Sequence, residues 1–94
     1  MNNVQLSEMS KKQSKHRGLY QVFLHNDNRN TFEHVIHSLS DVCGYNEMQS
    51  LQCALIVDSA GVCSICTDVY DECLFVYEYL QKVGLKVTMS KVKK

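Results

Sequence analysis

The sequence predicts an α+β domain in which a small three-stranded sheet carries three helices, in the order β-α-α-β-α-β. Three observations favour this class. Apolar and more polar residues alternate in short runs at both ends of the predicted domain, which is typical of strands with a buried face. Three longer runs between them have apolar residues at helical spacing, and each is followed by a glycine. The 94 residues suffice for a single domain with its own core.

The first strand is expected at the start of this domain. Tyr20, Val22 and Leu24 alternate with Gln21 and Phe23. This spacing places every second side chain on the same face of an extended chain. The run therefore predicts a strand that is buried on at least one face.

The first helix should follow within a few residues. Asn30 and Glu33 have the spacing of a capping box, so Asn30 is the predicted N-cap, and Gly44 should end the helix. The residues expected to face inward share helical spacing: Phe32, Val35, Ile36, Leu39, Val42 and Cys43. His34 and His37 miss this stripe and are expected to face solvent.

The second helix is predicted from a repeat of the same signals. Asn46 and Gln49 again have capping-box spacing, and Gly61 follows the run. One stripe of larger apolar residues is expected to face the core: Met48, Leu51, Leu55 and Ile56. This stripe predicts which side of the helix is buried.

The last third of the chain predicts a strand, a helix and another strand. A short β-prone run spans 62–66, and Asp68 should open a helix that ends near Gly84. The residues expected inward on this helix are Val69, Cys73, Val76, Tyr77 and Leu80. Residues 85–89 then alternate between apolar and polar side chains, as in a strand with one wet face.

Composition separates this domain from its ends. Residues 1–18 are polar and predict a flexible extension, 19–90 form the domain, and 91–94 make a basic C-terminal tail. The net charge is zero, which argues against a nucleic-acid binder. We found neither a secretory signal nor an apolar run that could cross a membrane, so we expect a cytoplasmic protein with reduced thiols.

The segment after the first strand is rich in acceptor oxygens. Asn26, Asp27, Asn28 and Asn30 fall within five positions, which is more than one turn or one helix cap requires. Carbonyl and carboxylate oxygens on a loop between rigid elements suit a small cationic group such as an ammonium. This loop is therefore a candidate binding site.

The same stretch resembles a known family. The strand and loop over residues 20–28, followed by Phe32-Glu-His-Val-Ile36, resemble the ClpS adaptor family, and the resemblance extends over residues 19–90. It implies a ClpS-like fold and a non-enzymatic adaptor without a cofactor. Such adaptors bind proteins with a bulky hydrophobic N-terminal residue, known as an N-degron. They deliver these substrates to a ClpA- or ClpC-type unfoldase of the Clp protease.

The resemblance also implies roles for individual residues. The substrate's α-amino group would be held by Asn26, Asp27 and Asp58. The first side chain would enter a pocket formed by seven residues: Asn28, Asn30, Phe32, Val35, Ala54, Val57 and Leu85. The unfoldase would dock near the start of the third helix, at Asp68, Asp71 and Glu72.

Several positions depart from the family pattern, among them Asn30 and Thr31 in place of a Thr-Pro pair. Asp58 stands where the family has an ammonium-binding histidine, Phe32 replaces a pocket-gating methionine, and Ala54 replaces a larger residue. A carboxylate also accepts hydrogen bonds from an ammonium, so Asp58 could preserve recognition. Alternatively, the chain is a diverged paralogue that docks on the unfoldase but has altered or lost N-degron binding, or Asp58 is simply a surface acid.

A CxxC motif offers an alternative of another class. Cys63 and Cys66 could belong to a cysteine-based metal or redox protein. However, no second cysteine pair has metal-ligand spacing, and residues three apart in a strand are expected to face opposite sides. The sequence therefore favours thiols packed in the core and predicts no metal site.

Overall fold

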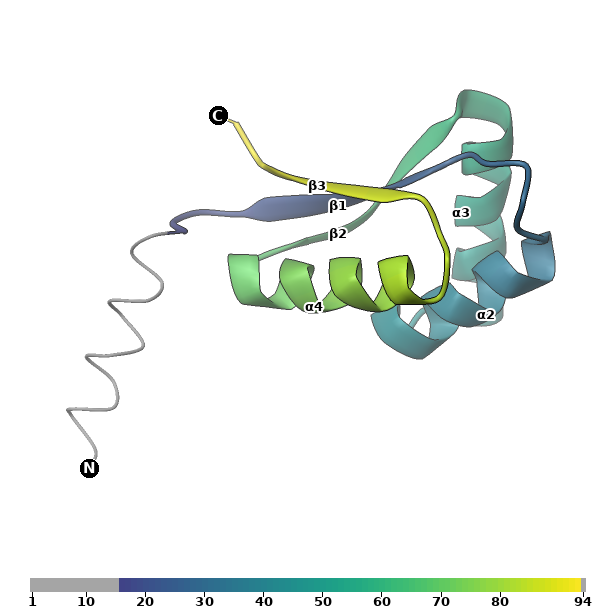
Figure 1. The fold of residues 1–94 in the computed structure, drawn as a ribbon, viewed down its shortest axis with the longest axis horizontal. Coiled ribbons are helices and arrows are strands. Elements are labelled where there is room, and N and C mark those ends of the chain that lie inside the picture. Colours follow the sequence, from purple (N-terminus) through teal and green to yellow (C-terminus); the bar gives the residue numbers. More distant parts are fainter. Residues whose placement is uncertain (1–15, 94) are drawn as a thin grey trace.

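The computed structural model describes residues 16–93, and its elements follow the predicted order. They are β1 (Tyr20–His25), α2 (Phe32–Cys43), α3 (Glu47–Ala60), β2 (Val62–Asp68), α4 (Tyr70–Lys82) and β3 (Val87–Lys91). Helix α4 runs along the sheet and packs against all three strands, whereas α2 and α3 pack on each other near one end of the sheet (Figure 1). The predicted fold class is confirmed. Most of the predicted flexible extension, and Lys94, lie outside the described residues.

The sheet has the order β2-β1-β3, with β1 in the centre and antiparallel to both neighbours. Val22 and Leu24 of β1 are buried in one cluster with Leu39 of α2 and Leu80 of α4, as their alternation predicted. This arrangement buries apolar side chains between the sheet and the helices, which is the main source of stability in so small a domain. It also makes the end of β1 a rigid support for the loop that follows.

Strand β2 contains an irregularity that corrects the expectation for the CxxC motif. The register between β1 and β2 shifts at Val22/Phe23, so that Val22 lies opposite Cys66 and Leu24 lies opposite Cys63. A bulge of this kind inserts one residue and reverses the alternation of side chains beyond it. Cys63 and Cys66 therefore share the face covered by helices, and the prediction that they face opposite sides is wrong.

The first residue of α2 also differs from the prediction. The N-cap is Thr31, whose Oγ1 accepts a hydrogen bond from the backbone N–H of His34 at 3.1 Å. Asn30 is not the cap because its side chain bonds to a carboxylate and a carbonyl elsewhere. The predicted end at Gly44 is confirmed. His34 is half-buried and donates from Nε2 to Val83 O at 2.8 Å, so only His37 faces solvent as expected.

Helix α3 has the predicted ends but buries the other side. The capping box of Asn46 with Gln49 and the C-cap at Gly61 are both confirmed. The predicted inward stripe is wrong for three of its four residues, since Met48, Leu55 and Ile56 are 63%, 49% and 47% exposed, while Leu51 is half-buried. The buried residues are smaller: Ser50, Cys53, Ala54 and Val57. Small side chains on this side let α3 approach α2 and β2 closely.

Helix α4 starts after the predicted cap. Its first residue is Tyr70 and no side chain caps it, whereas the Oδ1 atom of Asp68 accepts a hydrogen bond from Val69 N. Val69 is exposed, contrary to expectation, because it precedes the helix. The other predicted inward residues pack against the core, with Cys73, Val76 and Leu80 buried and Tyr77 half-buried. The final strand spans Val87–Lys91, so it begins and ends two residues later than predicted.

Candidate functional site

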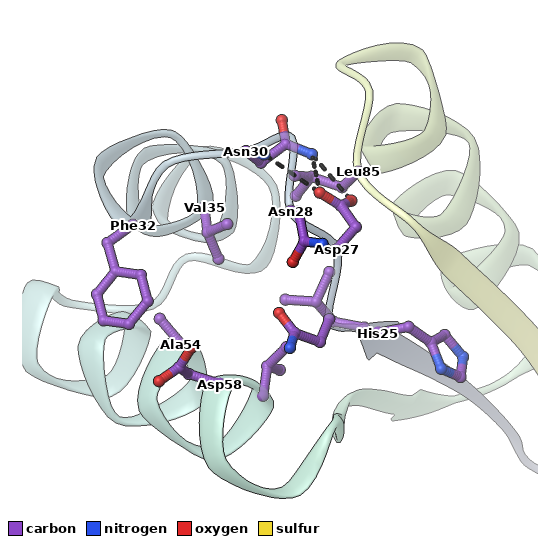
Figure 2. A pocket seen from close by; sticks show the side chains of 12 residues that line it. His25, Asp27, Asn28, Asn30, Phe32, Val35, Ala54, Asp58 and Leu85 are labelled. Carbon is purple, nitrogen blue, oxygen red and sulfur yellow. Dashed lines mark hydrogen bonds between the residues drawn. The ribbon is translucent and has the colours of Figure 1, made fainter.

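A pocket of about 140 Å³ lies where the end of β1, the β1–α2 loop, α2, α3 and the segment between α4 and β3 meet. It collects every residue predicted for the amine site and the side-chain pocket: Asn26, Asp27, Asn28, Asn30, Phe32, Val35, Ala54, Val57, Asp58 and Leu85. These residues come from segments far apart in sequence and meet at one site (Figure 2). The pocket therefore places acceptor oxygens beside an apolar wall.

Asp27 organises the loop that forms the polar side of the pocket. Its Oδ1 accepts hydrogen bonds from Arg29 N at 2.8 Å and Asn30 N at 3.1 Å, and both carboxylate oxygens accept from Asn30 Nδ2. The hydrogen bond from the Arg29 backbone N–H is the largest factor that lowers the pKa of Asp27 below its usual value. Asp27 is therefore ionised at neutral pH and holds the loop in one shape.

Asn30 joins this loop to the segment that follows α4. Its Nδ2 also donates to the carbonyl oxygen of Gly84 at 3.0 Å. At the start of the loop, Asn26 N donates to Gly61 O at 3.0 Å and His25 N donates to Lys86 O at 2.9 Å. These bonds anchor the loop at both ends, so its acceptor groups are held in place before a ligand binds.

Phe32, Ala54 and Asp58 form the opposite side of the pocket. Ala54 and Asp58 are four residues apart on α3 and therefore point to the same side of the helix. Figure 2 shows Asp58 and Ala54 on α3, across the pocket from Asp27 and Asn28, with the ring of Phe32 on the same side as Ala54. Asp58 is exposed, and its carboxylate takes part in no side-chain hydrogen bond among residues 16–93. It is free to accept one from a ligand.

Two further residues line the pocket that the sequence did not single out, Leu24 and His25. Both are the last residues of β1, directly before the polar loop, and this position was the available signal. Leu24 is buried and adds to the apolar lining. The Nε2 atom of His25 bonds to Thr88 Oγ1 of β3 at 2.7 Å, which ties the strand end to its neighbour.

The predicted docking residues lie away from the pocket. Asp68, Asp71 and Glu72 are exposed at the end of β2 and the start of α4. Asp68 is opposite Tyr20, the first residue of β1, whereas the pocket begins at Leu24, near the other end of the strand. With about 3.3 Å per residue, the two places are roughly 13 Å apart along the strand. The pocket and the acidic surface can therefore be occupied at the same time.

The lowered pKa of Asp27 predicts a loss of stability in acid. Because the pKa is lower in the folded than in the unfolded state, the ionised carboxylate stabilises the fold fully above the unfolded value near 3.8. This contribution disappears as the pH falls through the lower, folded value. We expect the urea midpoint of the wild type to fall relative to that of Asp27→Asn between about pH 5 and pH 2. Parallel curves for the two proteins would contradict a stabilising role for the carboxylate.

The thiols do not form the site that the CxxC motif suggested. Cys63 contacts Cys53, and Cys66 contacts Cys73, rather than each other. Burial raises the pKa of Cys66 to about 12 and that of Cys43 to about 11. Within residues 16–93, no group of three or more His, Cys, Asp or Glu side chains is placed to hold a metal ion.

No helix within residues 16–93 combines the length and apolar character needed to cross a bilayer.

Comparison with known proteins identifies the family of this chain. Residues 15–88 match the model of the family described as ATP-dependent Clp protease adaptor protein ClpS. The chain belongs to the ClpS family. This confirms the family inferred from the strand and polar loop, and with it the assignment to a group of Clp protease adaptors. No curated protein matched the chain.

One solved ClpS structure has the same fold. It is Agrobacterium tumefaciens ClpS2 bound to L-phenylalaninamide, and it superposes on this chain with a TM-score of 0.70 at 22% sequence identity. The match covers 77% of this chain and 94% of the ClpS2 chain. At this level of identity the similarity establishes the shared ClpS fold, while the chemistry of the pocket has to be argued from its own residues.

Proposed function

We propose that this ClpS protein is an adaptor whose pocket binds the N-terminal residue of a polypeptide when that residue is bulky and hydrophobic. The observation that carries the proposal is the pocket itself, in which acceptor groups and an apolar wall face each other across about 140 Å³. A free N-terminal residue has the complementary pair of features, an ammonium group and a side chain that leave the same Cα atom.

The ammonium is assigned to Asn26, Asp27 and Asp58. An ammonium has three N–H donors and needs three acceptors when it leaves water. Among residues 16–93, Asp27 Oδ2 accepts one hydrogen bond, from Asn30, and so has capacity for a second. Asp58 lies on the opposite side of the pocket, and its carboxylate makes no side-chain hydrogen bond within the same range. Two carboxylates near one ammonium favour the charged N-terminus over an internal peptide N–H by charge-assisted hydrogen bonds.

The side chain is assigned to the apolar part formed by Phe32, Val35, Ala54, Val57 and Leu85. An apolar cavity of about 150 Å³ holds a benzene ring, so this pocket is large enough for a single ring or a branched aliphatic group. The L-phenylalaninamide bound by Agrobacterium ClpS2 supports this assignment, because that molecule combines a free amino group with a phenyl ring. Burying such a group contributes about 1.5–3 kcal/mol.

Peptide titration tests this proposal. Labelled peptides that begin with Leu, Phe or Tyr should bind, and the same peptides with an acetylated N-terminus should bind at least about tenfold more weakly, since acetylation removes the charged donor. Equal binding of free and acetylated peptides would exclude an ammonium site. If no free peptide binds while the protein still binds an unfoldase, the chain is the diverged adaptor considered above. Asp58→His is then the first substitution to test, because the family has a histidine at this position.

We further propose that the acidic surface of Asp68, Asp71 and Glu72 docks on a ClpA- or ClpC-type unfoldase. All three residues are exposed and lie at the end of β1 opposite the pocket. Docking at this end leaves the pocket open, so substrate and unfoldase can be held together. Acids in the first turn of a helix also complement its dipole, so their effect on delivery must be measured apart from helix stability.

Charge reversal separates docking from substrate binding. Replacing Asp71 and Glu72 with lysine should slow degradation of a reporter with N-terminal Phe by a reconstituted Clp protease by about tenfold or more. Peptide affinity should remain within twofold, because neither residue lines the pocket. Glu47→Lys, which reverses an exposed acid in the first turn of α3, is the matched control and should leave degradation unchanged. Equal degradation by the double variant and the wild type would exclude this surface.

A further inference from the structure

Two cysteines from different elements are in sulfur contact. The Sγ atoms of Cys53 on α3 and Cys63 on β2 are 3.0 Å apart, while the other contacting pair, Cys66 and Cys73, is 3.8 Å apart. All these residues are free thiols. A disulfide requires about 2.05 Å between its sulfur atoms. Cys53 and Cys63 therefore need a movement of only about 1 Å to become bonded.

The two thiols also differ in access to solvent, as an oxidation site requires. Cys53 is 5% exposed, whereas Cys63 is only half-buried, so Cys63 is the more accessible residue of the two. The bulge in β2 is what turns Cys63 toward α3, since it places Cys63 opposite Leu24 on the buried face. The pairing thus depends on the sheet register and not on the CxxC spacing.

We propose that Cys53 and Cys63 are a modification site at which a peroxide forms a reversible intramolecular disulfide. Hydrogen peroxide oxidises the Cys63 thiol to a sulfenic acid and releases water. The Cys53 sulfur then attacks the sulfur of the sulfenic acid, the S–S bond forms, and a second water leaves with the sulfenic oxygen. Two thiols are oxidised to one disulfide, and one peroxide is reduced to water. A dithiol reductant reverses the reaction by exchange.

The bond would restrain the wall of the pocket. Cys53 directly precedes Ala54 in the sequence, and Cys63 lies opposite Leu24 in the sheet. Ala54 and Leu24 both line the pocket. A disulfide here ties α3 to the sheet behind the site where the proposed substrate side chain enters. It also closes a short loop in the unfolded chain, so we expect the melting temperature to rise by about 10 °C on oxidation.

The rate of the reaction should depend steeply on pH. Burial raises the pKa of the Cys53 thiol, and its contact with Cys63 raises it further. The thiolate is the attacking form, so bond formation is slow at neutral pH and gains up to about tenfold per pH unit in alkaline solution. The short distance between the sulfurs compensates by making the second step intramolecular.

Peptide mapping of the oxidised wild-type protein tests the proposal without any variant. After treatment with hydrogen peroxide and alkylation of the remaining thiols, cleavage before aspartate yields separate fragments for 41–57, 58–67 and 71–94. We expect 41–57 and 58–67 to be linked, with tandem mass spectrometry assigning the bond to Cys53 and Cys63. The link should disappear after treatment with dithiothreitol. A bond within 58–67, a bond from 58–67 to 71–94, or no bond would overturn the proposal.

Cysteine variants supply the second readout. Cys66→Ser keeps the proposed pair and should retain both the linked product and the rise in melting temperature. Cys53→Ser should lose both, and its reduced form is first shown to be folded by circular dichroism. A rise in melting temperature that persists in Cys53→Ser would assign the effect to another modification and contradict the proposal.

Discussion

Replacing Asp27 with alanine is expected to weaken binding of a peptide with N-terminal Phe about 30- to 100-fold, or about 2–3 kcal/mol. Asp27 is proposed both to accept from the ammonium and to hold the loop, through hydrogen bonds from Arg29 N, Asn30 N and the Asn30 side chain. Alanine removes both roles. Fluorescence polarisation with the labelled peptide measures the loss.

Asp27→Asn is the matched variant that separates these roles. An asparagine oxygen can still accept from the backbone N–H groups of Arg29 and Asn30, so the loop keeps its shape, but the charge is lost. We expect an intermediate loss of about three- to tenfold. Binding by Asp27→Ala that equals wild type would exclude Asp27 from the site, while equal losses in both variants would assign its role to charge alone.

Ala54→Leu is expected to reduce binding of Phe- and Leu-starting peptides by about ten- to 100-fold. Ala54 is 3% exposed and lines the pocket, so the added carbons enter a space of about 140 Å³ and displace the substrate side chain. The lost burial corresponds to about 1.5–3 kcal/mol. The fold should tolerate the change because the pocket offers room for the new side chain.

Ala60→Leu provides the control for this effect. Ala60 is the exposed last residue of α3 and does not line the pocket, so the same substitution should leave the affinity unchanged. Both variants are compared by peptide titration and by urea unfolding. An Ala54→Leu protein that binds the Phe peptide as well as wild type would show that the side chain does not enter this pocket.

The sequence predicted the parts of the fold that depend on neighbouring residues. The alternation of Tyr20 to Leu24 identified the central strand, and Gly44 and Gly61 marked the ends of two helices. The prediction failed at the start of α2, where two neighbouring residues can each cap the helix. Asn30 and Thr31 are both good N-caps, and Thr31 caps α2 because the Asn30 amide is bonded to Asp27 and Gly84.

The ten residues proposed from the sequence line one pocket, together with Leu24 and His25, which were missed, while the binding role of each stays a prediction. The resemblance to ClpS supplied Ala54, Val57 and Leu85, which no local pattern connects to the polar loop. The geometry within the site could not be predicted. Asp27 accepts hydrogen bonds from within the loop, whereas the Asp58 carboxylate makes no side-chain hydrogen bond within residues 16–93; both facts depend on contacts that only the folded chain makes.

The sequence by itself determined the order of the elements and the oxygen-rich loop after β1, because strand alternation, helix caps and side-chain chemistry are local properties. Only the tertiary structure decided which side of α3 is buried, how Asn30 reaches Gly84, and that Cys63 pairs with Cys53 rather than with Cys66. Helix α3 is apolar on both sides, so periodicity cannot rank them. Close packing decides which side of α3 is buried, and it favours the side with smaller residues. A one-residue shift in β2 decides that Cys63 faces Cys53.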